Sequence, residues 1–559
     1  MTDSSSKLNL LTFARHLLRQ QSESCIVFEF IRDLRSSDVS VYYPASANLA
    51  NSHEELDLSE PLILHITGRS NRAVVIGLGY TYYNPQTNET YFEPDDAAIE
   101  FEGKSESQFL YGPGVLSVAG PLAITASLIR DFVCAKKEMP GHLIIVLTPK
   151  SNEGGKVFTK TLEKVNDLIE ENKLKPIITL IPGGVRHGTS KKKIKIAKKS
   201  KKTLNLVAGS VGVISLQFLV KGIPAASSAR FSAFDPAALS AFLMSIFSES
   251  SLLWENKEDY PLVPPVISCW KTEKSFSAGY PVEWASFIIS LLYQNNEPAS
   301  LVSQIHSLSF EAFSKYISLL SRQSNELSSQ SKSITKKFTV PKWKPQVFSF
   351  KELKKDYKKE LPPFELSDEP TLEEIQQASF ERFKLVADNC STSDEPFIAY
   401  SLVPPVLPAY KLDANILIWP ILKKSLKDTG GKLSPWGVLN SIWQRLMFSQ
   451  WGSRNQRFWQ DDAPIGDFIE GFSPVEKYNF GPILAFGPVG FDEGLKSERL
   501  LIDPSFTQLP ELLKSLIYNL MTLEEYTTFV DKFKKKFRKI STRFGIGKEI
   551  DDYADDDEA

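Results

Sequence analysis

The chain has 559 residues, of which 42% are hydrophobic and 24% charged, and its formal net charge is −2. This composition is typical of a folded globular protein and excludes a largely disordered one, while the length predicts two or three domains. No uninterrupted apolar run approaches the roughly 18 to 20 residues that span a bilayer, and the first residues lack the basic-then-apolar order of a signal peptide. We therefore expect a cytoplasmic protein without a transmembrane segment.

Short apolar runs alternate with segments of helical periodicity in the first part of the chain. The predicted strands cover residues 62–66, 73–78, 143–147 and 177–181, and the predicted helices cover 8–19, 119–134 and 157–171. Such alternation predicts an α/β domain with a mixed, largely parallel sheet covered by helices on both faces.

The periodicity changes after residue 205, which indicates an inserted α+β domain. Its predicted elements are strand 207–220, helix 235–247, strand 263–270, helix 281–293, helix 298–320 and a strand near 346–350. A last αβ segment follows, with helix 371–388, strand 397–403, helix 435–448 and strand 483–486. The predicted divisions are 1–205 and 351–545 for the two parts of the α/β domain, 206–350 for the insertion, and 546–559 for an acidic tail. A basic amphipathic helix is predicted at 532–543.

Two glycine-framed blocks carry a resemblance to a known family. The first is Gly112–Ala123, followed by an apolar strand and Thr148-Pro149-Lys150-Ser151-Asn152-Glu153; the second is Gly487–Arg499. Their spacing resembles the di-zinc aminoacylase and carboxypeptidase-type metallopeptidases, most of all the arginine-utilisation branch. The resemblance implies a zinc-exopeptidase-like α/β fold with an inserted lid domain.

The same resemblance implies that the zinc chemistry is lost. A co-catalytic zinc pair needs histidine and carboxylate ligands and a glutamate base. The positions that match the family's ligands, general base and lid histidine hold other residue types, namely Leu78, Tyr80, Ser117, Ser151, Asn152, Ala226 and Gly494. A two-residue shift would place Glu153 at one position of the glutamate pair, still without a metal. We therefore expect no metal, no cofactor and no catalytic residue.

Other catalytic patterns are weaker. The short glycine clusters at residues 77–79 and 183–184 lack the phosphate-loop order and are interpreted as tight turns. His65 lies inside a predicted strand and is interpreted as a hydrogen-bonded core histidine rather than a ligand. His187 lies on a basic loop, where a solvated side chain is the simpler interpretation. The four cysteines are widely separated and are interpreted as reduced thiols.

A lysine-rich loop at residues 191–202 gives an alternative role. It holds eight lysines without an aromatic residue: Lys191, Lys192, Lys193, Lys195, Lys198, Lys199, Lys201 and Lys202. Such a loop could bind an anion, nucleic acid or an acidic protein surface, or it could be a solvated hairpin tip.

The sequence therefore predicts a metal-free pseudoenzyme that serves in binding, scaffolding or assembly. Its expected partner is a protein, and the resemblance adds a homodimer through the lid. Two alternatives stay open. One is a nucleic-acid-associated or ribosome-associated protein that uses the lysine-rich loop, and the other is an amide hydrolase with an unrecognised mechanism.

Overall fold

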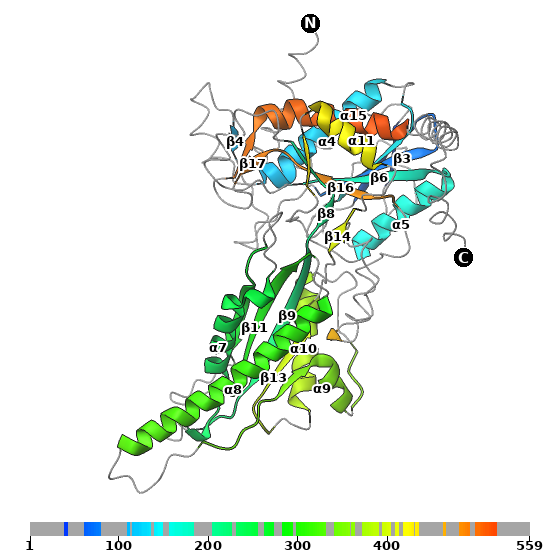
Figure 1. Ribbon diagram of the computed structural model, residues 1–559. Helices are drawn as coiled ribbons and strands as arrows, with labels where there is room; N and C mark the ends of the chain where they lie inside the picture. Colours follow the sequence, from blue (N-terminus) through cyan, green and yellow to red (C-terminus); the bar gives the residue numbers. More distant parts are fainter. Residues whose placement is uncertain are drawn as a thin grey trace, which may run out of the picture.

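The computed structural model describes part of the chain, in two lobes (Figure 1). The described residues are 39–42, 61–79, 109–111, 114–135, 139–148, 156–183, 204–225, 231–254, 262–272, 282–294, 298–330, 340–357, 359–363, 372–390, 394–403, 409–412, 418–429, 431–434, 462–464, 480–491 and 498–522. The predicted helices at 8–19, 435–448 and 532–543 lie outside them, as do the lysine-rich loop and the acidic tail.

An eight-stranded mixed sheet forms the centre of the first lobe. Its strands, in spatial order, are β1 (Val39–Tyr42), β2 (Leu62–Ile66), β5 (His142–Thr148), β3 (Arg72–Gly79), β6 (Lys175–Pro182), β16 (Ile483–Phe486), β7 (Asn205–Val207) and β15 (Lys432–Ser434). The four neighbours β5, β3, β6 and β16 run parallel. Their nearly continuous runs of Val, Ile and Leu are buried, as expected for strands covered on both faces.

Helices cover both faces of this sheet, with α5 on one side and α4, α11 and α15 on the other (Figure 1). Their bounds are α4 (Gly120–Ala135), α5 (Lys156–Glu171), α11 (Trp419–Thr429) and α15 (Leu509–Met521), with π-helical turns η1 (Val115–Ala119) and η5 (Pro504–Gln508) before α4 and α15. Two small sheets complete the lobe, one of β17 (Gly490–Phe491), β18 (Arg499–Leu501) and β4 (Phe109–Tyr111), the other of β8 (Gly209–Ser210) and β14 (Tyr410–Lys411). The predicted α/β fold class is confirmed.

The second lobe is built on a five-stranded sheet. Its strands, in spatial order, are β10 (Val266–Thr272), β11 (Trp284–Tyr293), β9 (Gly212–Lys221), β13 (Phe397–Leu402) and β12 (Val347–Ser349). Its helices are α7 (Pro236–Glu249), η4 (Ser251–Leu253), α8 (Pro298–Gln330), α9 (Phe350–Asp356) and α10 (Leu372–Asp388). Helices α7 and α8 pack on one face through aromatic side chains such as Phe218, Phe247 and Phe313.

The structure corrects three sequence predictions in and next to this lobe. The helix predicted at 281–293 is wrong, because these residues form β11, which pairs along its whole length with β9. The second sheet also continues past the predicted boundary at residue 350, since β13 lies between β9 and β12. The single strand predicted at 207–220 is broken into β7, β8 and β9 as the chain passes from one lobe to the other.

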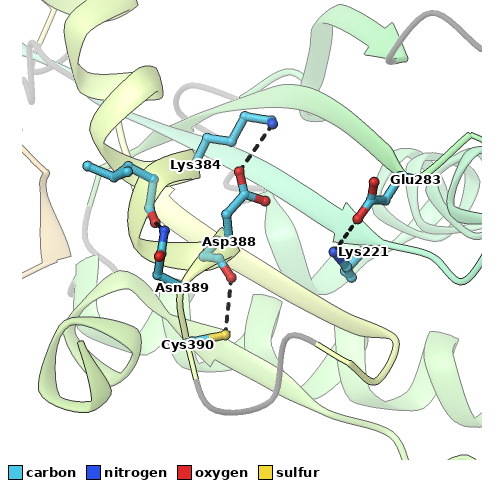
Figure 2. A network of polar contacts seen from close by, with 8 residues as sticks. Lys221, Glu283, Lys384, Asp388, Asn389 and Cys390 are labelled. Carbon is cyan, nitrogen blue, oxygen red and sulfur yellow. Dashed lines mark hydrogen bonds and ion pairs between the residues drawn. The ribbon is translucent and has the colours of Figure 1, made fainter. Parts of the chain in front are cut away.

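Helices α9 and α10 cover part of the second sheet's other face. Trp284 is 3% exposed, and two ammonium groups lie near its ring. The ring centroid is 4.7 Å from Lys221 Nζ and 5.8 Å from Lys384 Nζ. Each lysine is also paired with a carboxylate, Lys221 with Glu283 at 2.6 Å and Lys384 with Asp388 at 3.2 Å (Figure 2). This contact holds α10 on the ends of β9 and β11.

One helical stretch, Val115–Val133, is long and apolar enough to cross a membrane by length and composition. Most of it is buried within the protein, packed against α15 and the sheet. It is a core helix of the first lobe in this structure.

Candidate functional site

The carboxyl ends of the parallel strands β3, β5, β6 and β16 meet at one edge of the first sheet, where ligands bind in open α/β folds. Leu78, which matches a zinc-ligand position of the resembled family, lies at the end of β3 opposite Leu147 on β5. Its side chain is 1% exposed and belongs to the hydrophobic core of the lobe. The Thr148 hydroxyl donates a hydrogen bond to the backbone carbonyl oxygen of Leu78 at 3.3 Å. An isobutyl group has no lone pair for a metal, so this position does not fit zinc.

Ser117 matches the position of the bridging aspartate and lies in the π-helical turn η1. The turn begins after Gly114, whose φ of 74° is left-handed and suits glycine. The Ser117 Oγ atom is buried and has no hydrogen-bond partner in this part of the structure. A lone hydroxyl in an otherwise apolar turn does not supply the bridging carboxylate that a zinc pair requires.

Glu498 fixes this turn from the other end of the chain. Its side chain is 0% exposed, and its carboxylate accepts hydrogen bonds from the backbone N–H groups of Gly114 at 3.1 Å and Leu116 at 2.7 Å. These donors precede α4 and would otherwise be buried without a partner. A buried carboxylate thus stabilises the backbone that carries Ser117.

The two glycine-framed blocks of the sequence pack against each other. A Cβ atom at Gly490 would lie 2.2 Å from Leu116 Cδ2 and 2.3 Å from the Arg499 carbonyl oxygen, so only glycine fits there. Strand β18 pairs with both β17 and β4, which brings the second block beside the first. Gly490 and Glu498 belong to the second glycine-framed block, whose sequence predicts no role for either, and only the fold shows what they contact.

The remaining predicted site positions lie outside the described residues. They are Tyr80, Ser151, Asn152, Ala226 and Gly494, together with the eight lysines Lys191, Lys192, Lys193, Lys195, Lys198, Lys199, Lys201 and Lys202. The structure therefore places Ser117 on a turn whose backbone Glu498 holds and places Leu78 at the sheet edge, and the other positions stay predictions.

A pair of histidines, the buried His65 and the half-buried His142, lies in the same sheet. His65 Nε2 and His142 Nδ1 are 2.8 Å apart, and the rings stack with centroids 5.1 Å apart. Burial, with a smaller contribution from His142, lowers the pKa of His65 to about 4, and burial also lowers the pKa of His142. One ring donates and the other accepts in this contact, and the lowered pKa of each ring favours its neutral form. This agrees with the interpretation of His65 as a core histidine.

In the described part of the chain, no group of three or more His, Cys, Asp or Glu side chains is arranged to hold a metal ion. The two ligand positions that the structure does place, Leu78 and Ser117, do not fit the di-zinc centre of the resembled family.

The fold of this chain is similar to those of several solved peptidase structures, at low sequence identity. No protein-family model matches the chain, and neither does any curated protein. A tripeptidase from Staphylococcus aureus has a TM-score of 0.48 and 11% identity, with 92% of this chain and 99% of that chain covered. The di-peptidase Dug1p from Saccharomyces cerevisiae has a TM-score of 0.48 and 12% identity, with coverage of 93% and 97%. A dinuclear metal-binding peptidase of the M20 family from Bacillus subtilis has a TM-score of 0.46 and 10% identity, with coverage of 93% and 99%.

Proposed function

We propose that this chain is a catalytically inactive, metal-free relative of the M20-type metallopeptidases that serves as a binding or scaffold protein. The observation that carries the proposal is the burial of Leu78 in the hydrophobic core at the end of β3, where a zinc ligand of such an enzyme would stand. Ser117 supports it, because its hydroxyl replaces a carboxylate on the turn before α4. A fold can be kept after its chemistry is lost when its surfaces serve another purpose.

Turnover of acyl-amino acids and dipeptides, with and without added zinc, tests the loss of catalysis. We expect no turnover above the uncatalysed rate. A restored variant, Leu78→His with Ser117→Asp, is expected to stay inactive because the groups that orient metal ligands would still be missing. Turnover by the unmodified chain that survives a chelator would instead support the alternative of a hydrolase with an unrecognised mechanism.

The second lobe offers a surface for the proposed homodimer. Among the described strands, β10 ends the five-stranded sheet and pairs only with β11. Val266 and Trp270 on this strand are 56% and 53% exposed, although both are large apolar residues. An exposed apolar edge strand is a template for pairing with another strand. Two copies of β10 could pair antiparallel and extend both sheets.

Analytical ultracentrifugation at micromolar concentration tests this dimer. We expect a dimer for the unmodified chain and a monomer for a variant with Val266→Lys and Trp270→Lys. A monomer for both would remove the dimer and leave the inactive fold unaffected. A separate test applies to the proposal that residues 191–202 bind nucleic acid or an acidic surface. Replacing the eight lysines with serine should then abolish salt-sensitive binding.

A further inference from the structure

A short segment between two strands of the first lobe lies on the second lobe. The chain leaves the eight-stranded sheet at Ser434, the end of β15, and returns to it at Ile483, the start of β16. Between these strands, Ala463 is 3% exposed and belongs to the core cluster of the second lobe, with residues of β9, β11 and α8. The tripeptide 462–464 is thus anchored in the lobe to which its flanking strands do not belong.

Different chemical groups hold the three residues of this tripeptide. The Asp462 Oδ1 atom accepts a hydrogen bond from the Lys351 backbone N–H at 3.1 Å, and the side chain of Ser349 also hydrogen-bonds this carboxyl. The Ala463 methyl group is buried in the apolar cluster. The Pro464 carbonyl oxygen accepts a hydrogen bond from Arg382 Nη1 at 3.3 Å.

Hydrogen bonds within the second lobe also hold the groups that contact residues 462–464. Ser349 and Glu352 form a capping box at the start of α9. The Arg382 guanidinium also donates to the Pro362 carbonyl oxygen, which ties α10 to the chain that precedes it. The groups that receive the tripeptide therefore come from α9 and α10, the helices that lie beyond the predicted boundary of the inserted domain.

The surroundings of Asp462 include both charges and neutral polar groups. Burial raises the pKa of Asp462, and the nearby Glu352 adds to that, while the bonds from Lys351 and Ser349 and the charge of Lys351 oppose it. Burial raises the pKa of the nearby Tyr400 phenol, and the charge of Asp462 makes a smaller contribution in the same direction. His306 Nδ1 is 3.3 Å from the Tyr400 hydroxyl. The segment is attached through the hydrogen bonds of Asp462 and Pro464 and the buried methyl group of Ala463, at a place where burial disfavours a negative charge.

We propose that residues 462–464 act as an internal strap that ties the two lobes together, with α9 and α10 as its binding site. The site recognises a short Asp-Ala-Pro segment as it would a peptide ligand: a carboxyl or amide oxygen, a small apolar side chain and a free carbonyl group. The strap limits the movement of one lobe relative to the other. This inference does not depend on whether the chain is an enzyme.

Amide hydrogen exchange on the full-length chain tests the strap. In Asp462→Ala, we expect exchange in peptides covering 347–357 to rise at least tenfold, while α15 in the first lobe keeps its protection. Asp462→Asn retains the oxygen acceptor without a charge, so it should leave the protection unchanged or increase it. Asp235→Ala is the matched control, because Asp235 caps α7 through the N–H groups of Ala237 and Ala238 without linking the lobes.

The distance between the lobes gives the second measurement. Spin labels at the exposed Cys269 and at Lys514→Cys on α15 report it, in a chain whose other cysteines are replaced with serine. We expect the distance distribution to broaden in Asp462→Ala and not in Asp462→Asn or Asp235→Ala. An unchanged distribution in Asp462→Ala, or equal broadening in the Asp235→Ala control, would overturn the strap. Broadening in Asp462→Asn as large as in Asp462→Ala would also overturn the strap, because the neutral amide oxygen would then not be enough to hold residues 462–464 in place.

Discussion

The carboxylate of Glu498 accepts a hydrogen bond from the backbone N–H of Leu116 at 2.7 Å, across 382 positions of the chain. It accepts a second one from Gly114. Both oxygens of this buried carboxylate are therefore used to hold the backbone of the turn that carries Ser117. The conformation of the turn thus depends on a residue that lies far away in the sequence.

Replacing Glu498 should destabilise the first lobe. In Glu498→Ala, two buried N–H groups lose their acceptor, and each unsatisfied group costs about 1–3 kcal/mol. We expect the free energy of unfolding to fall by roughly 2–6 kcal/mol, and Glu498→Gln, which keeps one good acceptor oxygen, to lose clearly less. Urea unfolding measures both, and Glu511→Gln on the exposed side of α15 is the control. Equal stability of Glu498→Ala and the control would contradict this role.

Ser117 should be dispensable for stability. Because its buried Oγ has no partner among the described residues, Ser117→Ala should leave the free energy of unfolding unchanged or raise it by up to about 1 kcal/mol. Thr125, on the following helix α4, is 0% exposed with an equally unpartnered hydroxyl, so Thr125→Val is a matched comparison. Thermal unfolding checks both. A loss above about 1.5 kcal/mol for Ser117→Ala alone would reveal a bond or ligand that this account lacks.

The pair of His65 and His142 should make the chain sensitive to acid. The folded state lowers the pKa of His65 from 6.5 to about 4, so it favours the neutral ring. The resulting stability is complete above pH 6.5 and is lost as the pH falls towards 4. The loss from His65 is on the order of 3 kcal/mol, at 1.36 kcal/mol per pH unit.

Unfolding free energies measured between pH 7 and pH 4 check this sensitivity. His65→Leu removes the titrating group and should flatten part of the slope in that range. A slope in His65→Leu as steep as in the unmodified chain would mean that other groups cause the acid sensitivity.

Gly212 and Tyr293 should be coupled in their effect on stability, at the point where the chain passes from one lobe to the other. A Cβ atom at Gly212 would lie 2.2 Å from the Tyr293 ring and 2.6 Å from the Ala409 nitrogen, while the Tyr293 hydroxyl accepts a hydrogen bond from that nitrogen at 3.2 Å. Gly212→Ala should therefore cost about 1–3 kcal/mol or more. Because Tyr293→Leu removes the ring that the new methyl group meets, the double variant should cost less than the sum of the single changes. Additive losses would show that the two residues act independently.

The sequence predicted the first lobe well because its signals are local. Long runs of Val, Ile and Leu with helical periodicity between them correspond to β3, α4, β5, α5 and β6. Helix α15 was missed although its apolar residues recur every three or four positions, and this signal was available.

The second lobe shows where local signals fail. Ser286 and Ser290 are four residues apart, which places them on one face of a helix and equally on one face of a strand. The apolar residues between them fit both patterns, and only pairing with β9 decides for the strand. The position of β13 between β9 and β12 and the role of Glu498 depend on contacts between distant parts of the chain, which no periodicity encodes.

Metal content of the purified full-length chain tests the central claim most directly. Plasma mass spectrometry is done on protein prepared without chelator or metal-affinity tag, before and after dialysis against zinc. The account predicts less than about a tenth of an equivalent of zinc, since a site without carboxylate and imidazole ligands binds the ion weakly. Zinc retained at one or two equivalents after dialysis, and lost together with stability on chelation, would contradict it.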